Sequence, residues 1–177
     1  MRPASLILET ERLLFRHHEP DDLEAFCAME QDAEVRRYVG GAPRTREAAE
    51  GKFCGVLKSP PDQLGMWATV LKANGCYIGR CGVYSHIQGD IVIPDEGVLA
   101  FYLARQYWGQ GLASEAAMAF VRFGFQELGL RRIVATVQAE NRPSMRILEK
   151  LKFELVWREE GVRTFEHFAL LRPEERA

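Results

Sequence analysis

The chain has 177 residues, of which 47% are hydrophobic and 27% charged, and this composition is typical of a globular protein with one domain over residues 1–177. Its 23 basic and 25 acidic side chains give a formal charge of −2, which excludes a chain-wide attraction to nucleic acid or to an anionic membrane. The apolar runs are shorter than the ~20 residues of a spanning helix, and the opening segment does not resemble a signal peptide. We therefore expect a cytoplasmic protein that binds neither nucleic acid nor a membrane.

The cysteines do not have the spacing that is typical of a metal site. They are Cys27, Cys54, Cys76 and Cys81. The closest pair has four residues between its members, without a CxxC motif or a neighbouring group of histidines. We expect reduced, mostly buried cysteines and no metal cofactor.

The first half of the chain predicts helices followed by an antiparallel hairpin. In chain order, apolar periodicity and turn residues indicate a strand within residues 6–17, a helix over about 20–30, a helix that begins after Thr45, and strands over 66–71 and 76–84. Asn74-Gly75 is a strong signal for a two-residue turn, so the last two strands should pair antiparallel. Residues 85–97 are polar, with Gly, Pro and a short apolar insert, and they predict a loop.

The second half predicts two parallel strands joined by a helix. In chain order it contains a strand over about 98–104, a helix over 112–128, a strand over about 132–139, a helix from about 141 to 151, and strands over about 153–158 and 164–171. Because a helix separates 98–104 from 132–139, these two strands should run parallel. Together the elements predict an α+β fold with a mixed, mostly antiparallel sheet of about six to seven strands. They do not fit a doubly wound parallel sheet.

The turn before the helix 112–128 carries the clearest sign of ligand binding. Gly109 and Gly111 remove side chains where a ligand would approach the backbone. The N–H groups of the first helical turn lack helical partners, and the helix dipole makes that end positive. The pattern is typical of a pyrophosphate site, although a strand-to-helix turn can need the same glycines for its geometry alone.

A longer stretch of the sequence resembles a known family. The segment YWGQGLASEAAMAFVRFGFQELGLRRIVATVQAENRPSMRILEKLKF, residues 107–153, is similar to the GNAT acetyltransferases. More narrowly, it is similar to the branch that includes enzymes acetylating the amino termini of ribosomal proteins. The resemblance extends back through IGRCGVY at 78–84 and LETERLLFRHHEPDD at 8–22. It implies a GNAT-like sheet whose parallel strands splay apart, and an N-acetyltransferase that moves an acetyl group from acetyl-CoA directly to a primary amine.

The resemblance also implies which residues bind acetyl-CoA. In the family the turn before the helix holds the pyrophosphate, and that turn corresponds to Gln106, Gly109, Gln110, Gly111, Leu112, Ala113 and Ser114. The pantetheine would pair like an additional strand with Phe101, Tyr102 and Leu103, and the amide of Asn141 would bond it. The implied partners are acetyl-CoA and an amine acceptor, which could be a protein or peptide amino terminus or a small molecule. Homodimer formation is left open.

Ser144, Glu96 and Asn141 are the candidates for catalysis. Ser144 could point its hydroxyl at the sulfur, while a first-turn serine and an N-cap asparagine are also common structural residues. Leu148 stands where many members of the family have a tyrosine that protonates the thiolate, so Ser144 or water must serve. Glu96 lies two residues before Val98, where the amino-terminal branch often has a glutamate, and hence on the same side of a strand. It could act as a base through water, or it could be a solvated loop carboxylate.

The reaction does not require a strong base. An α-amino group has a pKa near ~8, and a thiol with a pKa of about 8.5 is a tolerable leaving group. Positioning could therefore supply most of the rate.

The turn before the last two predicted strands departs from the family. Lys152 replaces the glycine that is usual in the family before Phe153, which suggests a local change in turn geometry.

Two other functions compete with this reading. A nucleotide-binding oxidoreductase could use Gly109 and Gly111 with Glu140 on a ribose, but Ser114 replaces its third glycine and too few parallel strands remain. A noncatalytic acyl-CoA-binding module would keep the pyrophosphate site without turnover. Only measured turnover separates that module from an enzyme.

Overall fold

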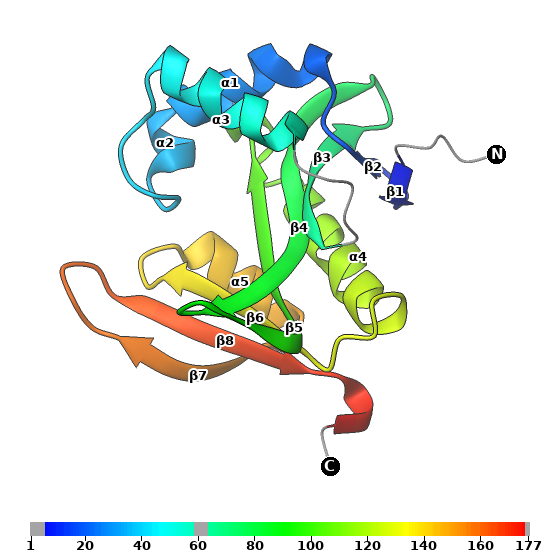
Figure 1. The fold of residues 1–177 in the computed structure, drawn as a ribbon, viewed down its shortest axis with the longest axis vertical. Coiled ribbons are helices and arrows are strands. Elements are labelled where there is room, and N and C mark those ends of the chain that lie inside the picture. Colours follow the sequence, from blue (N-terminus) through cyan, green and yellow to red (C-terminus); the bar gives the residue numbers. More distant parts are fainter. Residues whose placement is uncertain (1–5, 59–63, 176–177) are drawn as a thin grey trace.

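The computed structural model describes residues 6–58 and 64–175. A sheet of eight strands forms its centre, in the order β1-β2-β3-β4-β5-β6-β8-β7 (Figure 1). The strands are β1 (Leu6–Glu9), β2 (Leu13–Arg16), β3 (Gly65–Leu71), β4 (Cys76–Gln88), β5 (Ile91–Leu103), β6 (Arg132–Gln138), β7 (Glu154–Glu159) and β8 (Phe165–Leu171). Neighbouring strands are antiparallel apart from β5 and β6, which are parallel. The predicted mixed, mostly antiparallel α+β fold is confirmed.

Helices flank the sheet. They are α1 (Leu23–Gln31), α2 (Ala33–Arg36), α3 (Arg46–Lys58), α4 (Leu112–Gln126) and α5 (Arg142–Lys150), with short 3-10 turns at Pro20–Asp22, Arg105–Tyr107 and Pro173–Glu175. Figure 1 shows α1 and α3 side by side over one end of the sheet, while α4 runs along β4 and β5. Among the described helices, none is long and apolar enough to cross a membrane.

The main core lies between the sheet and α4. Phe15 of β2 meets Phe120 of α4 edge to face, with 4.9 Å between the ring centroids. Leu148 of α5 is fully buried in the same core. A separate apolar contact joins α1 to α3, where the rings of Phe26 and Phe53 lie 5.1 Å apart. These contacts hold α4 and α5 against the sheet and α3 against α1.

The parallel strands β5 and β6 pair only at their beginnings. Their register joins Glu96 to Arg132, Gly97 to Ile133 and Val98 to Val134. Beyond this point β5 continues to Leu103 beside β4, while β6 continues beside β8. The predicted parallel pair is confirmed, and the two strands part after three residue pairs.

The prediction of a loop over residues 85–97 is wrong. Strands β4 and β5 extend through this segment and are joined at Gly89, whose φ of +61° suits a tight turn. Ile87 pairs with Val92 in the hairpin, and both side chains are exposed. A hairpin exposed on both faces lacks the alternation of buried and polar residues by which a strand is recognised in a sequence.

The N-terminal segment also differs from its prediction. Residues 6–17 contain two strands, because Thr10 closes a turn in which its N–H donates to Leu13 O at 2.9 Å and its Oγ1 accepts from Leu13 N–H at 3.0 Å. This division and the later strands bring the sheet to eight strands, one more than predicted. The expected helix over 20–30 begins as a 3-10 turn and ends at Gln31, and α2 follows it.

Lys152 adopts the left-handed backbone conformation in the turn after α5, although it lacks the conformational freedom of glycine. Its φ is +66°, its N–H donates to Glu149 O at 3.0 Å, and the next N–H, of Phe153, donates to Leu148 O at 3.0 Å. These bonds form the usual left-handed helix ending. The change in turn geometry expected from the lysine is therefore absent, and the lysine is held in a conformation that costs about 1–2 kcal/mol.

We expect Lys152→Gly to raise the free energy of unfolding by about 0.5–1 kcal/mol, because relief of this strain exceeds the entropy that glycine adds to the unfolded chain. Urea unfolding measures the change. Lys152→Ala is the matched control, since alanine keeps the strain and should bring no gain. Equal stabilisation by both substitutions would contradict the explanation.

Candidate active site

The region where β5 and β6 part opens into a cleft of about 480 Å3. Its walls come from α2 and the residues after it, the end of β5, the start of α4 and the start of α5. The residues predicted from the sequence that line it are Phe101, Tyr102, Leu103, Gly109, Gly111, Leu112, Ala113, Ser114, Asn141 and Ser144. The fold thus brings the glycine turn, the predicted pantetheine strand and the start of α5 to one cleft.

The backbone of β5 presents an unpaired edge to this cleft. Asp95 O accepts from Arg131 N–H at 2.8 Å, at the start of the pairing with β6. Ala104 N–H donates to Ile78 O on β4 at 2.8 Å, at the other end of the strand. Because backbone groups alternate along a strand, odd-numbered residues of β5 face β6 and even-numbered residues face β4. Beyond Val98 the groups that face β6 point into the cleft.

This alternation selects among the predicted backbone contacts. The N–H and C=O groups of Phe101 and Leu103 face the cleft, whereas those of Tyr102 face β4. Leu103 O also accepts from Trp108 Nε1 at 2.7 Å, which holds the glycine turn against the strand. An extended ligand can add to such an edge as a further strand would.

The glycine turn exposes the positive end of α4. Gly109 and Gly111 have φ values of +73° and +77°, and a Cβ atom at Gly109 would meet no atom within 4 Å. The glycines are therefore required by backbone conformation and not by close packing. The first helical bond runs from Glu115 N–H to Gly111 O at 3.0 Å, so the N–H groups of residues 112–114 have no acceptor within the helix. Such groups bind anions well.

Arg12 and Glu115 anchor the turn from the outside. Arg12 donates from NH1 to Gln110 O at 2.9 Å and from Nε to Glu115 Oε2 at 2.6 Å. Burial raises the pKa of the Glu115 carboxyl, but hydrogen bonds from Thr10 and Arg12 outweigh it, so the pKa lies below its usual value. The glycine turn is thereby tied to the turn between β1 and β2.

Asn141 and Ser144 meet at the start of α5. Asn141 Oδ1 accepts from Ser144 N–H at 3.3 Å, as an N-cap residue does. Both residues also line the cleft. Asn141 therefore caps α5 in the structure. Because it also lines the cleft, a ligand in the cleft would lie next to it.

Gln106 and Gln110 lie outside the wall of the cleft. Gln110 Nε2 donates to Gln106 O at 2.9 Å, which joins the two ends of the turn. Both side chains are on exposed residues. The Gln110 side chain therefore stabilises the turn, and neither glutamine is among the residues that line the cleft.

Glu96 is also separate from the cleft. It lies within β5 and not in a loop, with Oε2 2.7 Å from His86 Nδ1 and Oε1 2.9 Å from Arg132 NH1. Burial raises the pKa of its carboxyl, but the hydrogen bonds to His86 and Arg132 outweigh burial and lower it below its ordinary value. A carboxylate with a lowered pKa and two donors already bound is poorly suited to accept a proton from an amine.

One wall of the cleft was missed by sequence reasoning. Val35, Tyr38 and Val39 line it, and Tyr38 OH donates to Glu140 O at 3.4 Å, which links this wall to the turn before α5. A four-residue helix is too short to show a 3.6-residue period. The one available signal was Asp32, whose side chain accepts hydrogen bonds from the first N–H groups of α2.

The described residues contain no group of three or more His, Cys, Asp or Glu that could hold a metal ion. All four cysteines are free. Cys27 and Cys81 are buried as expected, whereas Cys54 and Cys76 are exposed, so the expectation of mostly buried cysteines holds for only half of them.

Comparison with known proteins identifies the fold and the family. The model of the acetyltransferase (GNAT) domain matches residues 12–154. The uncharacterized N-acetyltransferase p20 of Bacillus licheniformis is 31% identical, over 83% of this chain and 82% of its own length. The uncharacterized N-acetyltransferase YnaD of Bacillus subtilis is 32% identical, over 81% and 80%. A GNAT-family acetyltransferase from Bacillus anthracis, solved by crystallography, has a TM-score of 0.78 at 26% identity and covers 93% of this chain and 97% of its own. The chain therefore belongs to the GNAT acetyltransferase family and is an acyltransferase.

Proposed function

We propose that this protein transfers an acetyl group from acetyl-CoA to a primary amine. The observation that supports this most is that the free edge of β5 and the open N-terminus of α4 line the same cleft. A strand edge suits the pantetheine arm and helical N–H groups suit the pyrophosphate, so two parts of one ligand match two parts of one cleft. An amino-terminal acceptor, as in the branch that acetylates ribosomal proteins, is part of the proposal.

The end of β5 and the start of α5 have chemical roles in this proposal. Acetyl-CoA, when bound, supplies the thioester that the amine attacks. The N–H of Leu103 binds the carbonyl oxygen as that atom gains negative charge, and Asn141 bonds the pantetheine. The hydroxyl of Ser144 donates a proton to the departing sulfur and takes up a proton from solvent in its place. The amine gives its own proton to solvent, since an α-amino group with a pKa near ~8 is neutral in about a tenth of molecules at pH 7.

Leu148 bears on the source of the proton. It replaces the family's tyrosine and is fully buried in the core, so no donor reaches the cleft from that position. Ser144 or water therefore remains as the proton donor.

The oxidoreductase alternative has little support, because a single parallel pair does not form the doubly wound sheet on which dinucleotides bind.

The proposed ligand is tested by thermal unfolding. A ligand that binds only the folded state at 100 times its Kd adds about 2.7 kcal/mol to the free energy of unfolding. Acetyl-CoA should raise the melting temperature, and NAD at the same concentration should have little effect. A larger shift with NAD would favour the dinucleotide alternative. A shift with acetyl-CoA but no acetylation of any amine would favour the noncatalytic module.

We expect Ser144→Ala to lower kcat by about tenfold or more while changing the KM for acetyl-CoA much less, because a proton donor acts as charge develops on the sulfur. The release of CoA thiol, followed from pH 6 to pH 9, measures both constants. A melting curve checks that the start of α5 is intact. Full turnover across this pH range would assign the proton to water or to the substrate.

A further inference from the structure

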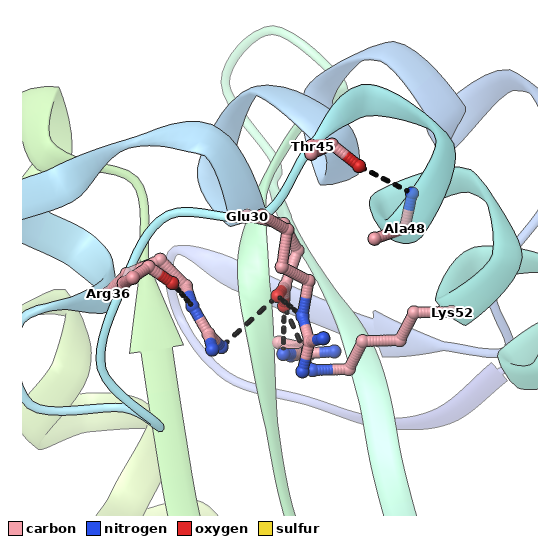
Figure 2. A network of polar contacts seen from close by, with 8 residues as sticks. Glu30, Arg36, Thr45, Ala48 and Lys52 are labelled. Carbon is pink, nitrogen blue, oxygen red and sulfur yellow. Dashed lines mark hydrogen bonds and ion pairs between the residues drawn. The ribbon is translucent and has the colours of Figure 1, made fainter.

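Glu30 of α1 is surrounded by four cationic side chains. Its Oε1 accepts hydrogen bonds from Lys52 Nζ at 3.1 Å and from Arg80 NH2. Its Oε2 accepts from Arg36 NH1 at 3.2 Å and from Arg44 Nε at 2.9 Å. Figure 2 shows Arg36 and Lys52 directed at Glu30 from different elements. We call these five residues the Glu30 cluster, and it holds three positive charges in excess.

Some cationic side chains of the Glu30 cluster are buried, and others are partly exposed to solvent. The side chains of Glu30 and Arg36 are each 5% exposed and that of Arg80 is 9% exposed, whereas Arg44 and Lys52 are 36% and 31% exposed. Each arginine carries five N–H donors and the lysine three, far more than two carboxylate oxygens can accept. Because buried cations are costly without matching anions, a second anion beside Arg44 and Lys52 would be favourable.

The Glu30 cluster lies directly behind a wall of the cleft. The Arg80 guanidinium is 5.3 Å from the centre of the Tyr102 ring, and Tyr102 lines the cleft. Arg36 follows Val35, which lines the cleft as well. Cys81, next to Arg80, packs in the core with α4, so Arg80 points to the opposite face of the sheet. The cluster therefore lies on the face of the sheet opposite α4 and adjoins the cleft through Tyr102, and this face is the one that the proposed pyrophosphate site at the start of α4 leaves free for an acceptor.

We propose that the Glu30 cluster selects an acceptor that carries a carboxylate close to its amine, either a free amino acid or a peptide with an acidic first residue. This inference rests on the proposed function. Arg44 and Lys52 bind the carboxylate at the open side, and Arg36 and Arg80 add positive potential from beneath. A guanidinium matches the geometry of a carboxylate. The same charges repel a polyamine.

Acceptor pairs that differ in their carboxylates test this proposal. We compare Glu-Ala-Ala amide with Gln-Ala-Ala amide, and glutamate with glutamine amide, using spermidine as the polycation. A charge-assisted hydrogen bond corresponds to a preference of about tenfold or more in kcat/KM for the acidic member. At least one pair should show it, and the pair that does identifies a peptide or a free amino acid as the source. Spermidine should be the poorest acceptor.

Substitutions at the open side separate selectivity from structure. Lys52→Gln and Arg44→Gln should each remove most of the preference while leaving kcat/KM for the neutral acceptors and the KM for acetyl-CoA nearly unchanged. Lys58→Gln removes one exposed charge from the same helix as Lys52 and should keep the preference. Equal losses for acidic and neutral acceptors would show that the cluster only holds the helices together, and would overturn the proposal. So would the absence of a preference in both pairs.

A binding measurement keeps the proposal testable without turnover. Glutarate carries carboxylates but no amine, and its affinity can be titrated calorimetrically in the presence of CoA. Weaker glutarate binding in Lys52→Gln than in Lys58→Gln would support the anion site even if no amine were acetylated, in which case the proposed function alone would fail. Equal glutarate affinity in the two variants would overturn the anion site.

Discussion

In a folded Gly111→Asp variant, the Kd for acetyl-CoA is expected to rise about a hundredfold. The substitution places a carboxylate at the N-terminus of α4, where the pyrophosphate would meet the N–H groups of residues 112–114. Hydrogen bonds to a charged group contribute roughly 1.5–3 kcal/mol each, and a hundredfold change corresponds to about 2.8 kcal/mol, so the loss of one or two such bonds suffices. Isothermal titration measures the change.

Gly111→Asn is the matched control for this prediction. Asparagine has nearly the same shape as aspartate and tolerates the left-handed conformation that Gly111 holds at φ +77°. It should weaken acetyl-CoA binding much less, because it adds no negative charge. Unchanged affinity in both variants would show that the glycine serves only the turn.

Glu30→Gln is expected to lower the free energy of unfolding by about 3–5 kcal/mol, because it leaves four cations around a buried position without their carboxylate. Glu24→Gln on the same helix is the control. Glu24 pairs with Arg46 but is 76% exposed, so its loss should change stability little. Urea unfolding at pH 7 compares the variants, and similar losses in both would contradict the electrostatic explanation.

The effect of Glu30→Gln should also depend on pH. Burial raises the pKa of the Glu30 carboxyl, but Arg80 and Lys52 and the hydrogen bonds from Lys52 and Arg44 outweigh burial, so its pKa lies below the ordinary value. A lowered pKa in the folded state contributes stability above the unfolded pKa of about 4.3, and this contribution is lost as pH falls through the folded pKa. The difference between wild type and variant should therefore shrink in acid.

The parts of the fold that follow from local sequence could be predicted. The helical connection α4 between β5 and β6 predicted that these two strands run parallel. Asn74-Gly75 marked the hairpin of β3 and β4, although its turn spans residues 72–75 and is longer than the two residues predicted. The end of the β4 and β5 hairpin could not be predicted in this way. Its side chains are exposed on both faces, so only pairing between the two strands makes it regular.

The same distinction applies to the site. Gly109 and Gly111 lie in one turn, so their local pattern was enough to predict an anion site at the start of α4. The surroundings of Glu96 depend on His86 and Arg132, which come from two other strands. The Glu30 cluster is more distant still, since Arg80 is 50 residues away in the sequence. Charge pairing over such separations leaves no local periodicity.

The central claim is tested most directly by the fate of a labelled acetyl group. The protein is incubated with acetyl-CoA that carries 13C in the acetyl group and with a panel of acceptors that contains peptides, amino acids and polyamines. The products are analysed by mass spectrometry. We expect the label on the amine nitrogen of at least one acceptor with the wild-type protein, and a strong decrease with Gly111→Asp. Binding of acetyl-CoA without labelling of any amine would contradict the claim and would identify the protein as an acyl-CoA-binding module.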